Sequence, residues 1–134
     1  MGQGFPKEFE ESGGRRTLKS VHGTYLRAQD YHWVADMVKA PPRAWENWYV
    51  ENLGSKVVFR AIHDQKRYLR AYANGVVDLA GATQAWETWT PRKNDDGSWS
   101  FESYHGLWLT AHPNGAVNSV QNCTASGHFW LEPW

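Results

Sequence analysis

Three segments of this 134-residue chain repeat one short pattern at a spacing of about 40 residues. Each segment is an aromatic residue followed by Leu, a polar residue and Ala, and they begin at Tyr25, Tyr68 and Trp108. A valine follows each aromatic anchor after nine residues, at Val34, Val77 and Val117. Three tryptophans recur every 41 residues, at Trp48, Trp89 and Trp130. Anchors that keep their register over two periods indicate a threefold internal repeat of one structural unit.

Each unit has the pattern of short β-strands joined by tight turns. Leu26 and Ala28 alternate with Arg27, which places the two apolar residues on one face of a strand. Residues 55–61 and 98–103 alternate in the same way and are rich in β-branched and aromatic residues. Asn-Gly pairs at 74–75 and 114–115 and Asp-Asp-Gly at 95–97 are typical turn sequences. Each period therefore predicts four strands, and no stretch shows sustained helical spacing.

A four-strand unit cannot bury its own apolar face, so the three units are expected to close on one another. A closed threefold sheet with hairpin caps is the β-trefoil, an all-β fold of twelve strands in three pseudo-repeats. We predict a single β-trefoil domain over residues 15–134 and a flexible N-terminal tail over residues 1–14. One shared core is expected to hold Leu26, Leu69, Leu109, Trp48, Trp89 and Trp130.

The chain has no net charge, but its charges are unevenly distributed. The net charge is −2 over residues 1–14, +6 over residues 15–70 and −4 over residues 71–134. Nucleic-acid-binding domains are usually strongly basic, so this balance argues against nucleic acid as a partner and still allows a local basic face. No apolar run approaches the ~18 residues of a membrane span, so stable membrane insertion is not expected.

Cysteine content and the N-terminal residues favour a cytoplasmic protein. The single cysteine, Cys123, has no partner for an internal disulfide, which fits a reducing compartment. Residues 1–14 lack the apolar core of a secretory signal.

The sequence shows no pattern typical of catalysis. Cys123 lies outside any nucleophile motif, and Asp95 and Asp96 are adjacent acids in a turn, where carboxylates are usually solvated. His22, His63 and His105 precede the aromatic anchors at nearly equivalent positions, and three such groups would suit zinc. Histidines at strand turns more often bond the backbone, however. We therefore expect no enzymatic activity, no metal and no cofactor.

The repeated strand, together with residues 48–51, 89–91 and 95–100, resembles the fascin-like family of fascin and hisactophilin. The resemblance covers residues 17–132. It implies a β-trefoil that acts as a non-catalytic binding module, with actin-filament binding as the main function. Fascins carry four such domains, and this chain has one.

A basic cluster is the candidate actin site. Actin has an acidic surface, which a basic patch would attract and hold. Alternation along the strand directs Arg27 and Arg70 away from the core. The predicted cluster comprises Arg27, Arg60, Lys66, Arg67 and Arg70.

A carbohydrate-binding lectin is the alternative function. Trp45 and Trp86 each lie three residues before a repeated Trp, whereas the third repeat is aligned with Gly127 at this position. An exposed ring beside polar groups suits a sugar, because the ring stacks on C–H faces while polar groups bind hydroxyls. The rings have a second interpretation, in which they cover the open end of the barrel. The candidate sugar-binding residues are Trp45, Glu46, Asn47, Trp86, Glu87 and Thr88. The oligomeric state is left open.

Overall fold

Six antiparallel strands close into a barrel in the computed structural model, which describes residues 14–29, 33–39, 41–62 and 67–134. The hydrogen-bonded order is β1, β4, β5, β8, β9, β12 and back to β1. Closure leaves these strands without an unpaired sheet edge. Their bounds are Arg15–Ser20 (β1), Trp48–Asn52 (β4), Val57–Ala61 (β5), Trp89–Lys93 (β8), Trp99–Ser103 (β9) and Phe129–Glu132 (β12).

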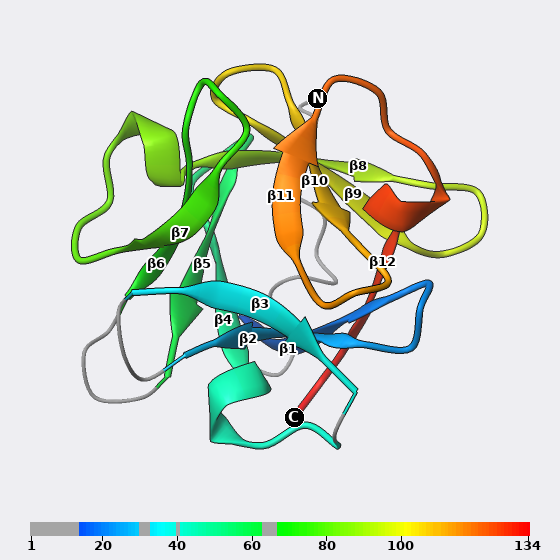
Figure 1. The fold of residues 1–134 in the computed structure, drawn as a ribbon. Helices are drawn as coiled ribbons and strands as arrows, with labels where there is room; N and C mark the ends of the chain where they lie inside the picture. The colour runs from blue at the N-terminus through cyan, green and yellow to red at the C-terminus, as the bar shows by residue number, and fades with distance from the viewer. Residues whose placement is uncertain (1–13, 30–32, 40, 63–66) are drawn as a thin grey trace.

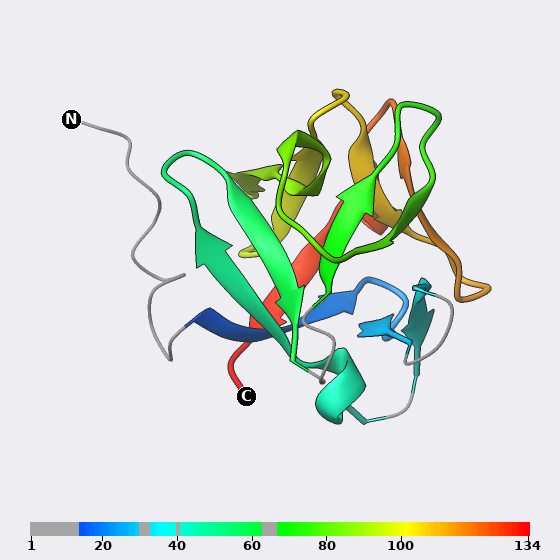
Figure 2. The ribbon, with the colours of Figure 1, turned by 90° about the vertical axis from the view of Figure 1, so that its left-hand side faces the viewer.

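Three hairpins are added to this barrel, one in each repeat. Each hairpin pairs with one barrel strand, namely β1, β5 or β9. The hairpins surround the centre of the view in Figure 1, and Figure 2 shows that they gather at one end of the barrel. They are Tyr25–Ala28 with Ala35–Val38 (β2, β3), Tyr68–Ala71 with Val77–Ala80 (β6, β7), and Trp108–Ala111 with Val117–Val120 (β10, β11).

A short 3-10 helix leads from each hairpin into the next barrel strand. The three helices are Ala44–Glu46 (η3), Ala85–Glu87 (η4) and Ala125–Gly127 (η5), and each lies against the first strand of its own hairpin. Among the described residues, no helix is long and apolar enough to cross a bilayer. The predicted architecture, an all-β trefoil of twelve strands in three pseudo-repeats, is confirmed.

Backbone hydrogen bonds join the three hairpins to one another in a cycle. Leu79 N–H donates to the Trp33 carbonyl (3.0 Å), Ser119 N–H to Gly75 (2.8 Å) and Met37 N–H to Gly115 (2.9 Å). The three accepting residues occupy equivalent turn positions with φ values of 56°, 95° and 95°. A Cβ on Gly75 would lie 2.7 Å from the Ser119 carbonyl oxygen, so close approach requires glycine there. Trp33 therefore adopts a positive φ where the other two repeats have glycine, and this conformation has some cost for a residue with a side chain.

The repeated leucines form the predicted core. Leu26, Leu69 and Leu109 are all fully buried, together with Trp48 and Trp89. Each of these two indoles also donates to a leucine carbonyl of its own hairpin. The Trp48 nitrogen lies 3.0 Å from the Leu26 oxygen, and the Trp89 nitrogen lies 3.2 Å from the Leu69 oxygen. The indoles thus satisfy their polar atoms inside the core.

The third core aromatic is Phe129, and the prediction of Trp130 was wrong. Phe129 is fully buried, whereas Trp130 is half-buried and pairs with Lys19 in the neighbouring strand. The second and third repeats have the same number of residues between the hairpin and the last strand, which begins at Trp89 in one and at Phe129 in the other. Phe129 therefore takes the core position, and because side chains alternate along a strand, Trp130 lies on the outer face.

Two other sequence expectations concern Val34 and the N-terminal tail. Ala35, and not Val34, corresponds to Val77 and Val117, because each of the three pairs with the Ala that ends the hairpin's first strand. Val34 is accordingly exposed. The predicted tail lies outside the described residues except for Gly14, which is buried.

Truncation of Leu69 to Ala is expected to lower the free energy of unfolding by about 2–5 kcal/mol, because it opens a cavity in a packed core. Leu53 is 54% exposed, so Leu53→Ala is the matched control and should cost less than about 0.5 kcal/mol. Urea unfolding at equilibrium measures both values. Similar costs for the two variants would contradict the repeat alignment.

Asp96 is expected to make folding stability depend on acid pH. The Ser98 hydroxyl and then the Ser98 backbone N–H donate to its carboxylate, and His128 adds to this, so its pKa falls from 3.8 to about 2. Because the folded pKa lies below the unfolded one, the contribution is present above pH 4 and is lost as the pH falls from about 4 to about 2. Across this pH range, the free energy of unfolding of Asp96→Asn should therefore fall by less than that of the unmodified chain. Asp95→Asn removes a charge from the same turn and is the control; an unchanged pH profile in Asp96→Asn would contradict the assignment.

Candidate functional site

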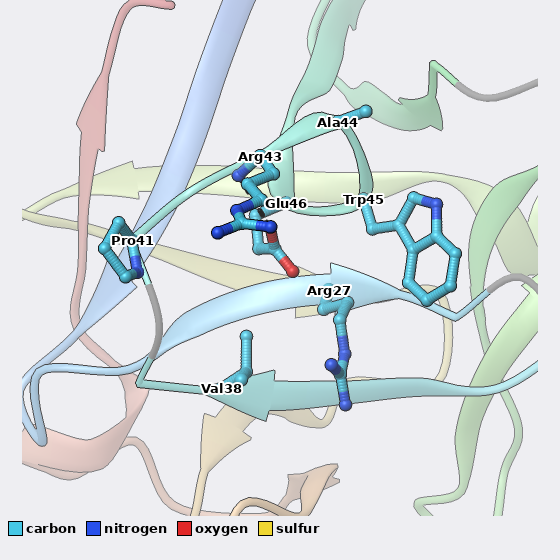
Figure 3. Close-up of a pocket in the computed structure, with 7 residues that line it drawn as sticks. All are labelled: Arg27, Val38, Pro41, Arg43, Ala44, Trp45 and Glu46. Atoms are coloured by element: carbon cyan, nitrogen blue, oxygen red, sulfur yellow. Dashed lines mark hydrogen bonds between the residues drawn. The ribbon is translucent and has the colours of Figure 1, made fainter.

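Two pockets occupy the same place in the first and second repeats, between the 3-10 helix and the hairpin. The first measures about 460 Å³ and the second about 330 Å³. Figure 3 shows the first, with Arg27 and Val38 on the two hairpin strands and Trp45 on the facing helix. The first is lined by Arg27, Val38, Pro41, Arg43, Ala44, Trp45 and Glu46. The second is lined by the equivalent residues Arg70, Gln84, Ala85, Trp86 and Glu87.

An exposed tryptophan stands at the same position of each pocket. Trp45 is 36% exposed and Trp86 is 40% exposed, so neither ring is buried as a cover for the barrel end would be. Trp86 makes edge contacts with Tyr72 (ring centres 5.4 Å apart) and His105 (4.9 Å). Such contacts orient the ring and leave much of it accessible to a ligand.

Glu46 and Glu87 hold the helices that carry these tryptophans. Each carboxylate accepts the backbone N–H three residues earlier, from Arg43 at 2.7 Å and from Gln84 at 2.6 Å. Both side chains are buried, although they line the pockets. Their main role is therefore to close the turn, as a capping-box acid does.

A hairpin arginine lines each pocket and is paired with an aspartate on the neighbouring strand. Arg27 bonds Asp36 through two nitrogens at 2.9 and 2.7 Å, and Arg70 bonds Asp78 in the same way at 2.9 and 3.0 Å. Each aspartate accepts one further hydrogen bond. The donor is the Gln29 amide at 2.7 Å in the first repeat and the Tyr72 hydroxyl at 3.0 Å in the second.

These pairs fix both the charge and the orientation of the guanidinium. The hydrogen bond to Asp36 raises the pKa of Arg27 above its ordinary value, and the attraction of Asp36 and Glu46 adds to this rise. Asp78 raises the pKa of Arg70 by the same mechanism. Each pocket therefore holds an oriented, permanently charged donor beside carboxylate acceptors and an aromatic ring.

The third repeat has neither the ring nor the acid. Ser126, and not Gly127 as the sequence alignment assumed, corresponds to the two tryptophans, while Gly127 corresponds to the glutamates. A Cβ on Gly127 would lie 3.0 Å from the Cys123 sulfur and 3.2 Å from the Leu109 oxygen. The helix thus packs directly on its hairpin and leaves no room for a longer side chain.

Polar residues at the equivalent hairpin positions are also changed in the third repeat. Thr110 and Asn118 replace the arginine and the aspartate, and His112 bonds Asn118 at 2.7 Å. The arrangement of the first two repeats is therefore specific to them.

Asn47 and Thr88 were predicted to share the tryptophan pockets, but neither is among the lining residues. Both occupy the C-cap position of their 3-10 helices. Thr88 donates its hydroxyl hydrogen to the Ala85 carbonyl at 2.7 Å, which closes the turn.

The predicted basic cluster is divided among several environments. Arg27 and Arg70 belong to separate pockets, and Arg60 is paired with Glu51 at 2.9 Å and stacks on Tyr49. Arg67 is buried, with its guanidinium 4.3 Å from the Trp33 ring centre. Lys66 lies outside the described residues. Three of these arginines, Arg27, Arg60 and Arg70, are thus ion-paired with neighbouring acids.

Histidines serve local contacts in the described part of the chain. The Nε2 atom of His22 lies 3.2 Å from the Ala111 oxygen and 3.0 Å from the Ser126 hydroxyl, and His105 packs on Trp86. His63 lies outside the described residues. Within the described ranges, no group of three His, Cys, Asp or Glu residues is placed to hold a metal.

Sequence reasoning missed the aspartates Asp36 and Asp78, and also Arg43 and Gln84. The sequence could have indicated the aspartates. If each repeated strand forms a hairpin, Asp36 lies directly across from Arg27 and Asp78 across from Arg70. Opposite charges facing each other on neighbouring strands are a common stabilising pair.

Replacement of Glu87 by Ala is expected to lower the free energy of unfolding by about 1–2 kcal/mol, because the Gln84 N–H loses its acceptor. Glu87→Gln keeps an acceptor oxygen and should retain most of the stability. Urea unfolding of the two variants measures the difference. Full stability of Glu87→Ala would show that the carboxylate does not hold the turn.

Comparison with known proteins supports the fold. No protein-family model matches the sequence, and no curated protein matches it in sequence. In structure the chain is similar to SeviL bound to asialo-GM1 saccharide, with a TM-score of 0.77 over 89% of this chain and 96% of that one. The two sequences are only 12% identical, so the fascin-like assignment is not confirmed and no comparison supports actin binding. The likeness and the strand order together place the chain among the β-trefoils.

Proposed function

We propose that this chain is a non-catalytic carbohydrate-binding β-trefoil with one sugar site in each of its first two repeats. The observation that carries the proposal is the recurrence of one arrangement at two equivalent places. In both, a partly exposed tryptophan faces a hairpin arginine that is held by an aspartate. The fold does not require either group at these positions, since the third repeat has neither.

The arrangement suits the chemistry of a sugar ring. A pyranose has apolar C–H faces that stack on an indole, and hydroxyls that need both donors and acceptors at its rim. The residues that line the first pocket include Trp45, Arg27 and Glu46, and Asp36 pairs with Arg27. Because the arginine and the aspartate orient each other, little side-chain freedom is lost when a hydroxyl binds.

The structural comparison favours glycan over actin as the ligand. SeviL has the same fold and was solved with a saccharide bound, which supports the proposal without locating a site in this chain. The actin alternative depends on a free basic face, and the ion pairs of Arg27, Arg60 and Arg70 reduce the charge available to an acidic filament. Co-sedimentation with actin filaments distinguishes the two ligands directly.

Each site is expected to bind a monosaccharide weakly. A single open pocket with one stacking ring covers little apolar area, and each sugar hydroxyl exchanges water for protein. Two sites on one rigid domain gain affinity only for ligands that display several sugars together. A dense glycan surface should therefore be bound far more tightly than a free monosaccharide.

The test is a glycan array followed by titration of the best ligand. The double variant Trp45→Ala/Trp86→Ala should lose glycan binding, because both stacking surfaces are removed, and each single variant should keep one site. The loss of stability should be small, since both rings are partly exposed.

Trp134 provides the matched control, because it is 36% exposed like Trp45 but packs on Tyr49 outside both pockets. Trp134→Ala should bind glycans as the unmodified chain does. Full binding by the double variant, or equal loss in the control, would contradict the proposed sites.

A further inference from the structure

The two pockets differ in charge at one equivalent residue. Arg43 precedes η3 and Gln84 precedes η4, with nearly the same backbone angles (φ −130° and −126°, ψ −162° in both). Both side chains are exposed, and both backbone N–H groups donate to the glutamate three residues later. The main chain is therefore equivalent, and the side chain at this position distinguishes the pockets.

The Arg43 guanidinium is available to a ligand. No hydrogen bond or ion pair links its side chain to any residue that the structure describes, whereas Arg27 in the same pocket is held by two bonds to Asp36. Figure 3 shows Arg43 between Pro41 and Trp45 on the helix side of the pocket. An unpaired guanidinium in a sugar pocket is a ready partner for a carboxylate, which it binds with two parallel hydrogen bonds.

The charge balance of the two pockets differs accordingly. The lining of the first pocket has two positive groups, Arg27 and Arg43, and one negative group, Glu46. The lining of the second pocket has one of each, Arg70 and Glu87. An aspartate paired with Arg27 or Arg70 adds the same charge in both repeats, so the first pocket is more positive by one charge. The surrounding sequence has the same bias, since residues 15–70 carry a net +6 and residues 71–134 a net −4.

The first pocket is also the larger. The connection from Val38 to Ala44 is one residue longer than the connection from Ala80 to Ala85, and it adds Pro41 to the lining. Its volume is about 460 Å³, against about 330 Å³ for the second pocket. A sugar with an additional substituent therefore has more room beside Arg43 than beside Gln84.

We infer that the Trp45 pocket selects sugars that carry a carboxylate, whereas the Trp86 pocket takes neutral sugars. Arg43 is the residue that determines this specificity. The inference rests on the proposed glycan-binding function and divides it between two sites of different preference.

The experiment follows the two indole N–H signals separately by NMR during sugar titrations. Trp45→Phe and Trp86→Phe identify the signals by their loss. The probes are matched pairs that differ only by an acid group: methyl galactoside with methyl galacturonide, and methyl glucoside with methyl glucuronide. At the Trp45 signal, the acidic member of at least one pair should bind roughly two- to fivefold more tightly, the range of one partly exposed ion pair. At the Trp86 signal, the neutral member should bind at least as well.

Exchange of the distinguishing residues tests the assignment. Arg43→Gln should remove the acid preference at Trp45, while Gln84→Arg should create an acid preference at Trp86. Both substitutions change exposed side chains and keep the backbone N–H, so the backbone spectrum should otherwise be unchanged. Added salt should reduce the acid preference, because it screens the charge pair.

The outcomes separate this inference from the function on which it rests. Binding of neutral and acidic sugars with equal affinity at Trp45, or an acid preference that survives Arg43→Gln, would overturn the inference and leave carbohydrate binding intact. If no sugar of the panel shifts either indole signal, both the inference and the proposed sites fail.

Discussion

The hydrogen bond from the Trp48 indole to the Leu26 carbonyl, repeated between Trp89 and Leu69, determines where the surface pockets lie. Each bond ties the first residue of a barrel strand to the first strand of the preceding hairpin. The 3-10 helix just before that residue is thereby held at a set distance from the hairpin, and the pocket is the space between them. The Phe129 ring, unlike an indole, has no N–H to donate, and in its repeat Gly127 packs against the Leu109 backbone and the Cys123 sulfur. A core contact thus positions a feature of the surface.

The ion pairs on the hairpins have more to do with orientation than with stability. Arg27 and Asp36 are each about one quarter exposed, and a cross-strand pair of this kind contributes roughly 0.2–1 kcal/mol. Asp36 also accepts a hydrogen bond from Gln29, as Asp78 does from Tyr72, so each carboxylate is held by two side chains. A polar group that is already oriented loses little freedom when it binds a ligand. The rigid barrel below the hairpins supports the same arrangement in both repeats.

The sequence was sufficient to predict the fold because closure imposes the same apolar residues on every repeat. Leu26, Leu69 and Leu109 are recognisable for that reason, and all three are fully buried. The third aromatic anchor was misplaced because Phe129 and Trp130 are adjacent, and only the pairing of β12 with β1 shows which of them faces inward. The ion pairs of the predicted basic cluster escaped notice for a related reason. Charge counted along the sequence does not show which acid lies across a hairpin from which base.

The differences among the three repeats are more informative about function than their similarities. Closure of the trefoil requires the buried residues and the hairpin turns, and it leaves the helix positions free to vary. The helix residues vary accordingly: Trp-Glu in two repeats and Ser-Gly in the third, preceded by Arg43, Gln84 and Thr124. The difference between Arg43 and Gln84 changes the charge of one pocket and involves no core residue. A threefold scaffold can therefore carry sites of different charge, because the forces that hold it together act on other residues than those that meet a ligand.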